Sequence, residues 1–443
     1  MTLTPDPFAA TAAEATVAAE TRTAVDPTPT ELFRQRARPR RGFGIFLMLA
    51  MIGAGAALMS SVLLTLTLKA AELDADGATT IISISSAIAG VFTIVALPAF
   101  GALSDRSRSR FGRRRPYLLV GAALFAIGGI ALIAAPNLPV FVLAHLCIIA
   151  GHISTSVAVT ALIPDQLPAN RRGPVTALTS IGTPVGALFG LAVSVPFGDD
   201  LIALVGIPVA FAILSIVLLA FVVRDPKWDL PRPRFSLREF IGVFWVNPLK
   251  HSSFTWVFTS RILVFCGVAA LNGYQAIFML QKMHLEPAGL GTAILLTVVV
   301  TTGATLLVAP AVAKLSDRVG RRKPFILGAA IILAAGLVVA SFASDLPSYL
   351  VACGIVGVGQ GVYFAVELVL ATEVLPDPDN PAKDLGILKV ADNLPTTFVA
   401  VAAPALLAIG AGAAGPNFAA LFIAGALAAV AGGFVILLVR GAR

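Results

Sequence analysis

The chain has 443 residues, of which 57% are hydrophobic and only 13% are charged. Soluble globular domains carry about 25% charged residues, so this composition excludes a soluble fold for most of the chain. The formal net charge is +8, and an arginine-rich run such as 106–115 would suggest nucleic-acid binding in a more polar protein. We therefore expect a membrane protein that binds no nucleic acid.

Long apolar stretches recur along the chain, and each is long enough to cross a hydrocarbon layer about 30 Å thick. They are rich in Ala, Gly and Leu and do not alternate, which favours helices over barrel strands. Twelve spans are predicted, at about 43–68, 78–103, 117–135, 138–163, 174–195, 201–223, 253–280, 288–312, 324–343, 346–372, 385–410 and 416–439. The predicted fold class is an all-α membrane protein with twelve transmembrane helices.

Two segments lie outside these spans. Residues 1–42 are rich in Ala, Thr and Pro without a long apolar run, which predicts a disordered tail and no signal peptide. Residues 224–252 form a central linker, in which Ser236 and Glu239 have the spacing of a capping box within an apolar-rich segment. We expect the linker to contain a helix that lies in the membrane interface.

Basic residues concentrate in alternate loops. If both termini share one side, that side holds the arginines of the tail, of the 101–121 segment and of the linker, and the basic residues of 314–323. The opposite loops hold mainly acidic residues. Because Lys and Arg mark the cytoplasmic side of a membrane, both termini are predicted to be cytoplasmic.

One basic motif occurs twice. Residues 103–123 read LSDRSRSRFGRRRPYLLVGAA and residues 315–330 read LSDRVGRRKPFILGAA, each after an even-numbered span. The copies are about 210 residues apart, close to half of the transmembrane region, and such internal repeats build many secondary transporters. We therefore predict two six-helix halves, residues 43–223 and 253–443.

The duplicated motif resembles that of the major facilitator superfamily. The matching residues are Gly101, Leu103, Asp105, Arg106, Gly112, Arg113 and Arg114 in the first copy and Leu315, Asp317, Arg318, Gly320, Arg321 and Arg322 in the second. The first copy has additional residues between Arg106 and Gly112, and Ala313 replaces the leading Gly of the second copy. The expanded copy, with PDQLPANRRG at 164–173, is similar to the sugar–cation symporter branches, the plant-type sucrose carriers and glycoside–pentoside–hexuronide carriers.

The resemblance implies a major facilitator fold and secondary active transport by alternating access, not enzyme activity. It also implies a small-molecule substrate, a proton as coupling ion, no cofactor or metal, and a monomer in the cell membrane. We expect symport of a sugar or glycoside. The alternatives are proton-coupled efflux of an amphiphilic metabolite, which the apolar first span favours, organic-anion transport through Arg261, and a transporter-like sensor.

The two motif copies predict a gate on the cytoplasmic side. A carboxylate beside a helix N-terminus is stabilised by roughly 0.3–1 kcal/mol, so Asp105 and Asp317 are expected to hold the opposite half when that side closes. A polar cluster on the eleventh span, at Lys389, Asp392, Asn393, Thr396 and Thr397, supplies a further gate pair, Lys389 with Asp392. The predicted gate residues are Gly101, Asp105, Arg106, Gly112, Arg113, Asp317, Arg318, Arg321, Lys389 and Asp392.

Polar side chains inside the spans predict the solute pathway, because they are costly in hydrocarbon unless they face a cavity or a partner. The resemblance implies that the first, fourth, seventh and tenth spans surround that cavity. The candidates are His145, His152, Arg261, Asn272, Tyr274, Gln275, Gln360, Tyr363 and Glu367. Glu367 is expected to carry the coupling proton because burial favours the neutral form of a carboxyl group, and His152 is the alternative carrier. The hydroxyl residues of the second, fifth and eighth spans are expected to serve mainly helix packing.

Overall fold

The computed structural model describes residues 42–107, 109, 111–225, 251–374, 381–410 and 415–439. Within the helices, the side chains of residues 169, 170, 368, 381–387, 389 and 390 are not among those described. The predicted disordered tail and the predicted interfacial helix of the linker lie outside the described residues. The side chain of Lys389, expected in a gate pair, lies outside them as well.

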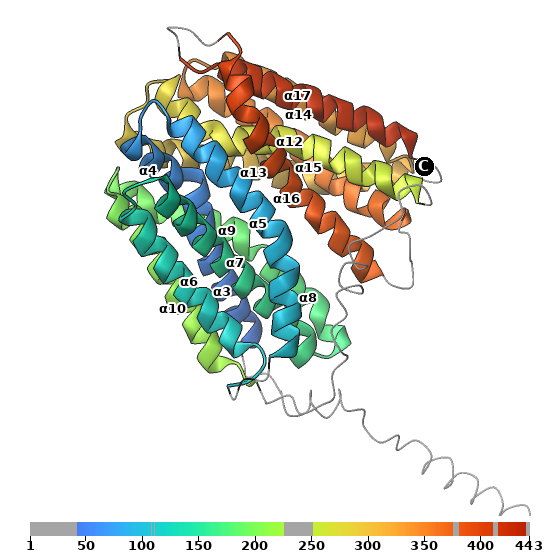
Figure 1. The fold of residues 1–443 in the computed structure, drawn as a ribbon. Helices are drawn as coiled ribbons and strands as arrows, with labels where there is room; N and C mark the ends of the chain where they lie inside the picture. Colours follow the sequence, from blue (N-terminus) through green and yellow to red (C-terminus); the bar gives the residue numbers. More distant parts are fainter. Residues whose placement is uncertain are drawn as a thin grey trace, which may run out of the picture.

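The described residues are helical almost throughout (Figure 1). The elements are α3 (Phe43–Ser60), η1 (Ser61–Thr65), α4 (Leu66–Leu73), α5 (Ala78–Arg106), α6 (Arg115–Ile133), α7 (Leu138–Gln166), α8 (Ala169–Ser180), α9 (Gly182–Ser194), η2 (Val195–Phe197), α10 (Leu201–Val222), α12 (Ser252–Gln281), α13 (Pro287–Val319), α14 (Lys323–Phe342), α15 (Leu346–Glu373), α16 (Pro381–Ala408), α17 (Phe418–Val435) and η3 (Ile436–Leu438). Twelve helices among these residues are long and apolar enough to cross a membrane. The prediction of twelve transmembrane helices is confirmed.

The helices pack as two sets of six spans. In the first half α3 packs on α7, α9 and α10, and α6 packs on α7 and α10. In the second half α12 packs on α16 and α17, and α14 packs on α15 and α17. The halves meet mainly where α5 lies beside α16 and α9 beside α13 (Figure 1).

Several helices begin at side chains that complete their first turn. The carboxylate or amide oxygens of Asn137, Asp200 and Asn417 accept backbone N–H groups at the starts of α7, α10 and α17. Asp345 and Ser348 form a capping box at the start of α15. Hydrogen bonds from Ser348 lower the pKa of the exposed Asp345 carboxyl, because they stabilise its charged form.

Two spans depart from regular α-helices. The fifth runs from Arg171 to Phe197 and breaks at Ile181, because Pro184 lacks the N–H that would continue α8 into α9. The first contains a π-turn, η1, where the hydroxyls of Ser60 and Ser61 donate to the carbonyls of Ala56 and Ala57. A π-turn contains one residue more than a regular α-helical turn, and such turns are often found at functional sites.

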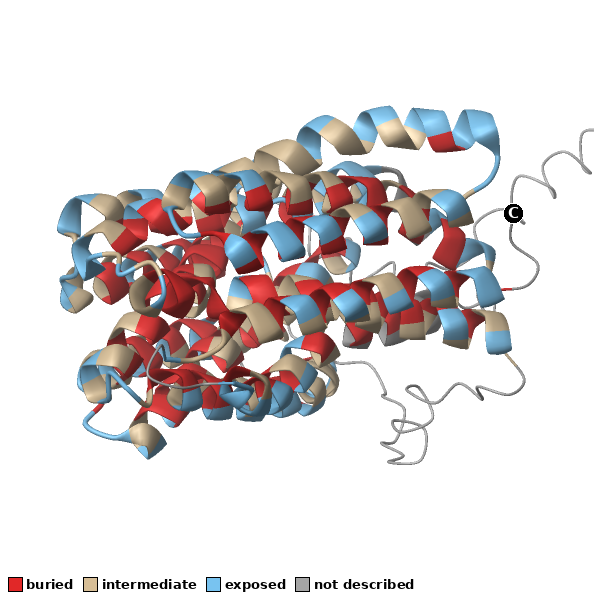
Figure 2. Cartoon of the chain, turned by 90° about the horizontal axis from the view of Figure 1, so that it is seen from above, coloured by how far each residue is buried: buried red, intermediate tan, exposed pale blue. Residues whose placement is uncertain are grey.

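Buried residues lie on the faces between helices, whereas the outer faces of the bundle are largely exposed (Figure 2). The exposed side chains include large apolar groups such as Leu307, Phe221 and Phe342, as expected for surfaces that contact lipid. Small residues bring helices close together inside each half. At Gly186, for example, an added Cβ would lie 2.7 Å from the backbone nitrogen of Ala56.

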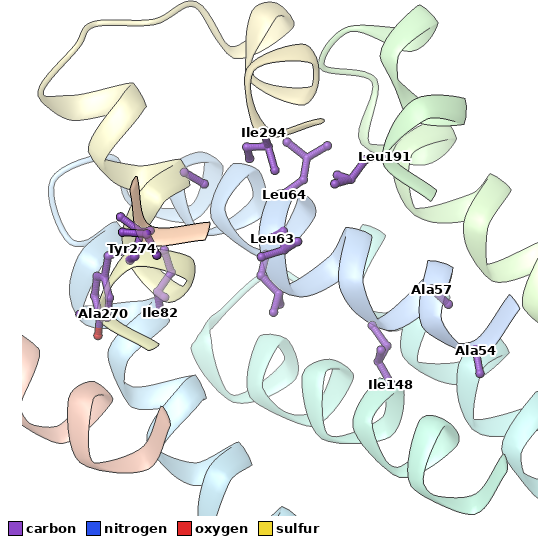
Figure 3. Close-up of a cluster of buried hydrophobic side chains, with 14 of the residues drawn as sticks. Ala54, Ala57, Leu63, Leu64, Ile82, Ile148, Leu191, Ala270, Tyr274 and Ile294 are labelled. Atoms are coloured by element: carbon purple, nitrogen blue, oxygen red, sulfur yellow. The ribbon is translucent and has the colours of Figure 1, made fainter. Parts of the chain in front are cut away.

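The halves are joined at one end of the bundle and diverge towards the other (Figure 1). We call the end where α5, α7, α13 and α15 finish the basic end, and the other the acidic end. At the acidic end the hydroxyls of Ser83 and Tyr274 are 2.7 Å apart, and Gln281 donates to the carbonyl of Ala75 at 3.0 Å. Leu64 of η1 lies next to Ile294 of α13 (Figure 3).

At the basic end the last turns of α5 and α13 are exposed. Leu103 is 57% exposed and Leu315 is 50% exposed, at equivalent positions of the two motif copies. An added Cβ at Gly101, near the end of α5, would meet no atom within 4 Å. The described residues therefore show a conformation that is closed at the acidic end and open at the basic end.

Candidate functional site

A cavity of about 310 Å³ lies between α3, α5, α7 and α16, in the middle of the bundle. Its apolar lining is Leu58, Met59, Val62, Ala89, Gly90, Ile149 and Ile153, and its polar lining is Ser86, Thr93, His145, His152, Asn393 and Thr396. Among the described residues, no side chain of this lining is an acid, a lysine or an arginine. The volume is at the lower end of the usual range for small-molecule sites, about 300–1,000 Å³.

Two histidines of α7, His145 and His152, line the cavity. His145 is buried, and its Nδ1 is 2.7 Å from the hydroxyl of Ser85 on α5. His152 hydrogen-bonds to the backbone of Ala54, whereas its buried Nδ1 has no partner within the described structure. Both histidines, named from the sequence as candidates for the solute pathway, line this cavity.

A buried ion cluster lies in the second half and joins three helices. Arg261 of α12 donates from Nη1 to Oε2 of Glu367 on α15, and from Nε to Oδ1 of Asp392 on α16 at 2.7 Å. The side chains of Arg261 and Glu367 are 9% and 3% exposed. We refer to Arg261, Glu367 and Asp392 as the ion cluster.

Aromatic rings cover the ion cluster. The guanidinium carbon of Arg261 lies 5.4 Å from the centroid of Phe265, which packs edge-on against Tyr363 with centroids 5.9 Å apart. Tyr363 is buried and Gln360 is half-buried on the same helix. The sequence grouped Gln360, Tyr363 and Glu367 on one face but did not reveal that Arg261 and Asp392 meet Glu367.

The remaining candidates on α12 have other surroundings. Tyr274 joins the halves at the acidic end through Ser83, so its hydroxyl is engaged in this conformation. Gln275 is buried and accepts from the hydroxyl of Thr297 on α13 at 3.1 Å, a contact within the second half. Asn272 is exposed. The structure does not bring these three residues into the wall of the cavity.

The basic end of the first half holds a network around Arg114. Its Nη2 donates to Asp105 at 2.8 Å, its Nε to Asp165 at 3.0 Å and its Nη1 to Ser104 at 2.7 Å. Arg113 also donates to Asp105, at 2.7 Å. Among the described residues, Asp105 therefore binds Arg113 and Arg114 of its own half, whereas a closed gate is expected to join it to the opposite half.

Gly112 and Asp225 complete this network. Gly112 has a φ of +106°, and an added Cβ would overlap the backbone and carboxylate of Asp225, so only glycine fits. The Asp225 carboxylate accepts the backbone N–H groups of Arg114 and Arg115 at the start of α6, where the helix dipole favours a negative charge. Arg115 donates to the carbonyl of Val223 at the end of α10.

The second half repeats this arrangement with fewer contacts. Arg322 is 2.8 Å from Glu373 and 3.9 Å from Asp317, and Lys323 donates to the carbonyl of Val439 at 2.6 Å. Gly320 ends α13 with a φ of +65°. Arg106, Arg318 and Arg321 are exposed at this end of the bundle.

The cavity also includes residues that the sequence did not assign to it. Asn393 and Thr396 belong to the polar cluster on the eleventh span, for which the sequence predicts a gate. Ser86 and Thr93 of α5 line the cavity, although the hydroxyl residues of this span are expected to serve packing. Their seven-residue spacing places them on one helical face, and this was the available signal. Asp392 pairs with Arg261, a contact that the sequence did not indicate. Its expected pair with Lys389 involves a side chain outside the described residues.

Comparisons with known proteins agree with this architecture. The sequence matches the Major Facilitator Superfamily over residues 44–382 and again over 257–442. The glucose transporter GlcP of Staphylococcus epidermidis (strain ATCC 12228 / FDA PCI 1200) is 25% identical over 239 residues. That alignment covers 48% of this chain and 51% of GlcP, so it spans about half of either protein.

Solved transporter structures share the fold at low sequence identity. The nucleoside transporter NupG superposes with a TM-score of 0.68 at 13% identity, covering 90% of this chain and 100% of NupG. A bacterial homologue of the human lysosomal transporter Spinster, in an inward-facing and unoccupied conformation, gives a TM-score of 0.62 at 15% identity, covering 90% and 96%. The chain belongs to the Major Facilitator Superfamily and is a multi-pass membrane transporter of small solutes, not an enzyme.

Proposed function

We propose that the protein is a proton-coupled symporter of the cell membrane that takes up an uncharged sugar or glycoside. The observation that carries this proposal is the composition of the cavity, whose described lining combines hydroxyl, amide and imidazole groups with an apolar wall and holds no charged side chain. Such a lining suits a neutral solute with several hydroxyl groups. The similarity to a glucose transporter and to the sugar–cation symporter branches supports the same class.

The ion cluster argues against organic-anion transport. Arg261 is the cation expected to pair with an anionic substrate, but it already contacts two carboxylates, Glu367 and Asp392. An arriving anion would have to displace one of them. The cluster instead suits proton coupling, because two carboxylates share one guanidinium in a largely buried site. A proton bound by one carboxylate would reduce the cost of keeping its charge buried.

We assign the coupling proton to Glu367 and keep His152 as the alternative carrier. Glu367 is 2% exposed and lies within the second half, whereas His152 lies directly in the cavity wall. The basic end, which carries the motif loops, is assigned to the cytoplasm by its arginines. With this assignment the conformation is inward-facing. We further propose that both termini are cytoplasmic and that the protein acts as a monomer.

A second candidate function rests on the apolar part of the cavity. Leu58, Met59, Val62, Ile149 and Ile153 give one wall that would contact the hydrophobic surface of an amphiphilic metabolite. Proton-coupled efflux of such a compound uses the same cavity and the same ion cluster. The two functions differ in the direction of coupled movement and in the solute that competes for the site.

The test is transport in vesicles that contain purified protein, with D-glucose as the first probe and a panel of glycosides and amphiphilic drugs as competitors. A proton driving force equivalent to 100 mV supplies about 2.3 kcal/mol, enough for roughly fortyfold accumulation. Glu367→Gln should abolish this accumulation and preserve exchange between equilibrated sides, and His152→Ala serves as the matched variant. Accumulation at the wild-type level in Glu367→Gln would remove Glu367 from the proposal.

A further inference from the structure

One short segment of α16 contacts both the ion cluster and the cavity. Asp392 accepts from Arg261 at 2.7 Å, and the next residue, Asn393, lines the cavity, followed by Thr396 one turn later. Consecutive residues of an α-helix point about 100° apart, so the same backbone turn can face two sites at once. A displacement at Asp392 therefore also displaces Asn393.

Thr397, one turn after Asn393 on nearly the same face of α16, packs tightly against the first half. An added Cβ at Gly90 of α5 would overlap the hydroxyl of Thr397 and would lie 3.3 Å from its Cα. The backbones of α5 and α16 are therefore nearly in contact at Gly90 and Thr397. Figure 1 shows the two helices side by side. Gly90 also lines the cavity. Because close-packed interiors transmit small shifts, a movement of α16 here changes the cavity wall.

We propose that Asp392 is a positioning residue for substrate binding: its ion pair with Arg261 fixes the turn of α16 that presents Asn393 and Thr396 to the cavity. The proposal rests on the proposed function, in which the cavity binds solute and the ion cluster carries the proton. The positioning role of Asp392 adds a physical connection between the cavity and the ion cluster. Protonation of Glu367 removes one of the two negative charges that Arg261 contacts, so Arg261 pairs more strongly with Asp392. The turn is then held more firmly for a solute that engages Asn393.

A simpler role for Asp392 is to neutralise Arg261. That role depends only on charge, and Glu367 already supplies one carboxylate to the same guanidinium. The two roles differ for Asp392→Glu, which keeps the charge but lengthens the side chain by one methylene. Neutralisation predicts no effect of this variant on the cavity. Positioning predicts a displaced α16 and an altered cavity wall.

The first experiment needs no substrate. Cys147, Cys266 and Cys353 are replaced by Ala in the full chain, and a reporter cysteine is introduced at Thr396 of α16 or, as the matched control, at Ser86 of α5. N-ethylmaleimide alkylation is then timed with Asp392, Asp392→Glu and Asp392→Asn. The expected result is a change of at least threefold at position 396 for both variants and less than 1.5-fold at position 86. An unchanged rate at 396 in Asp392→Glu, or equal changes at both reporters, would overturn the proposal.

The second experiment uses D-glucose transport. Asn393→Ala and Asp392→Glu should each raise KM several-fold while the maximal rate stays within twofold. Because both act through one turn of α16, the double variant should raise KM no more than the larger single effect. Multiplicative effects would contradict a shared path. If the wild type does not transport D-glucose, the sugar assignment fails, but the alkylation experiment still decides the role of Asp392.

Discussion

Arg114 and Arg322 occupy equivalent positions in the two halves, and each directs its Nε at an acidic side chain near the end of a neighbouring span. The distances are 3.0 Å to Asp165 and 2.8 Å to Glu373. The Arg114 side chain is 4% exposed, however, whereas that of Arg322 is 19% exposed. The duplicated motif therefore builds a buried network in one half and a more open one in the other.

This asymmetry predicts unequal losses of stability. Arg114→Ala removes hydrogen bonds to Ser104, Asp105 and Asp165, and charge-assisted hydrogen bonds contribute about 1.5–3 kcal/mol. Arg322→Ala removes a more exposed pair and should cost below about 1 kcal/mol. Thermal unfolding of the detergent-purified protein, followed by tryptophan fluorescence, measures both. Equal shifts in Tm would show that burial does not distinguish the two networks.

The gate role predicted for Asp105 and Asp317 can be tested by measuring transport. Asp105→Asn should strongly reduce transport while expression and ligand affinity stay close to those of the wild type, because Asp105 acts when the cytoplasmic side closes. Labelling of a cavity cysteine from that side should become faster. Asp317→Asn is the matched variant at the second copy of the motif. Unchanged flux in both variants would exclude a gate role for these carboxylates.

Gly90 is predicted to tolerate no side chain. In Gly90→Ala the new methyl group overlaps Thr397 and forces α5 and α16 apart beside the cavity, so transport should fall at least tenfold. Thr397→Ala in the same chain removes the overlapping hydroxyl and should restore part of the activity. Gly206→Ala is the control, because no atom lies within 4 Å of its added Cβ. Transport assays of the three variants at matched expression levels test the prediction.

Tyr274→Phe should favour opening at the acidic end. The variant removes the hydrogen bond between Tyr274 and Ser83, which is worth roughly 0.5–1.5 kcal/mol net. The population open at that end should therefore rise about two- to tenfold. The rate at which a membrane-impermeant maleimide reaches a cysteine at position 86 from that side reports the change. Ser83→Ala should produce the same effect, and different effects of the two variants would argue against a shared hydrogen bond.

Arg261 should be replaceable only together with its partners. Arg261→Met leaves two carboxylates in a buried site, and breaking a buried ion pair costs about 3–5 kcal/mol. Arg261→Lys should recover little, because one ammonium cannot reproduce donation from both Nε and Nη1. Combining Arg261→Met with Glu367→Gln should restore folding, measured by monodisperse yield, without restoring proton-driven accumulation. Full stability of Arg261→Met alone would contradict the assignment.

The spans and the motif repeat could be predicted from the sequence, because both are local patterns of hydropathy and residue order. The contacts that build the site are not local. Arg261 and Asp392 are 131 residues apart, and nothing in either segment indicates that the seventh and eleventh spans meet. Helical spacing placed Asn393 and Thr396 in one polar cluster, but it could not show whether that surface faces a gate or a cavity. The additional residue of η1 has no composition signal in an apolar helix.

That additional residue determines how the side chains of the first span are oriented. A π-turn adds one residue to a helical turn and so rotates all later side chains by about 100° about the helix axis. Before it, Met59 faces the cavity; after it, the buried Lys69 ammonium donates to the carbonyl of Ile133 at 3.2 Å and to Glu72 at 3.0 Å. A helical wheel drawn with a constant period over residues 43–73 would turn Lys69 away from Ile133. The two ends of this span therefore follow different phases of one helix, and a one-residue deletion within Ser61–Thr65 would move the lysine away from the Ile133 carbonyl.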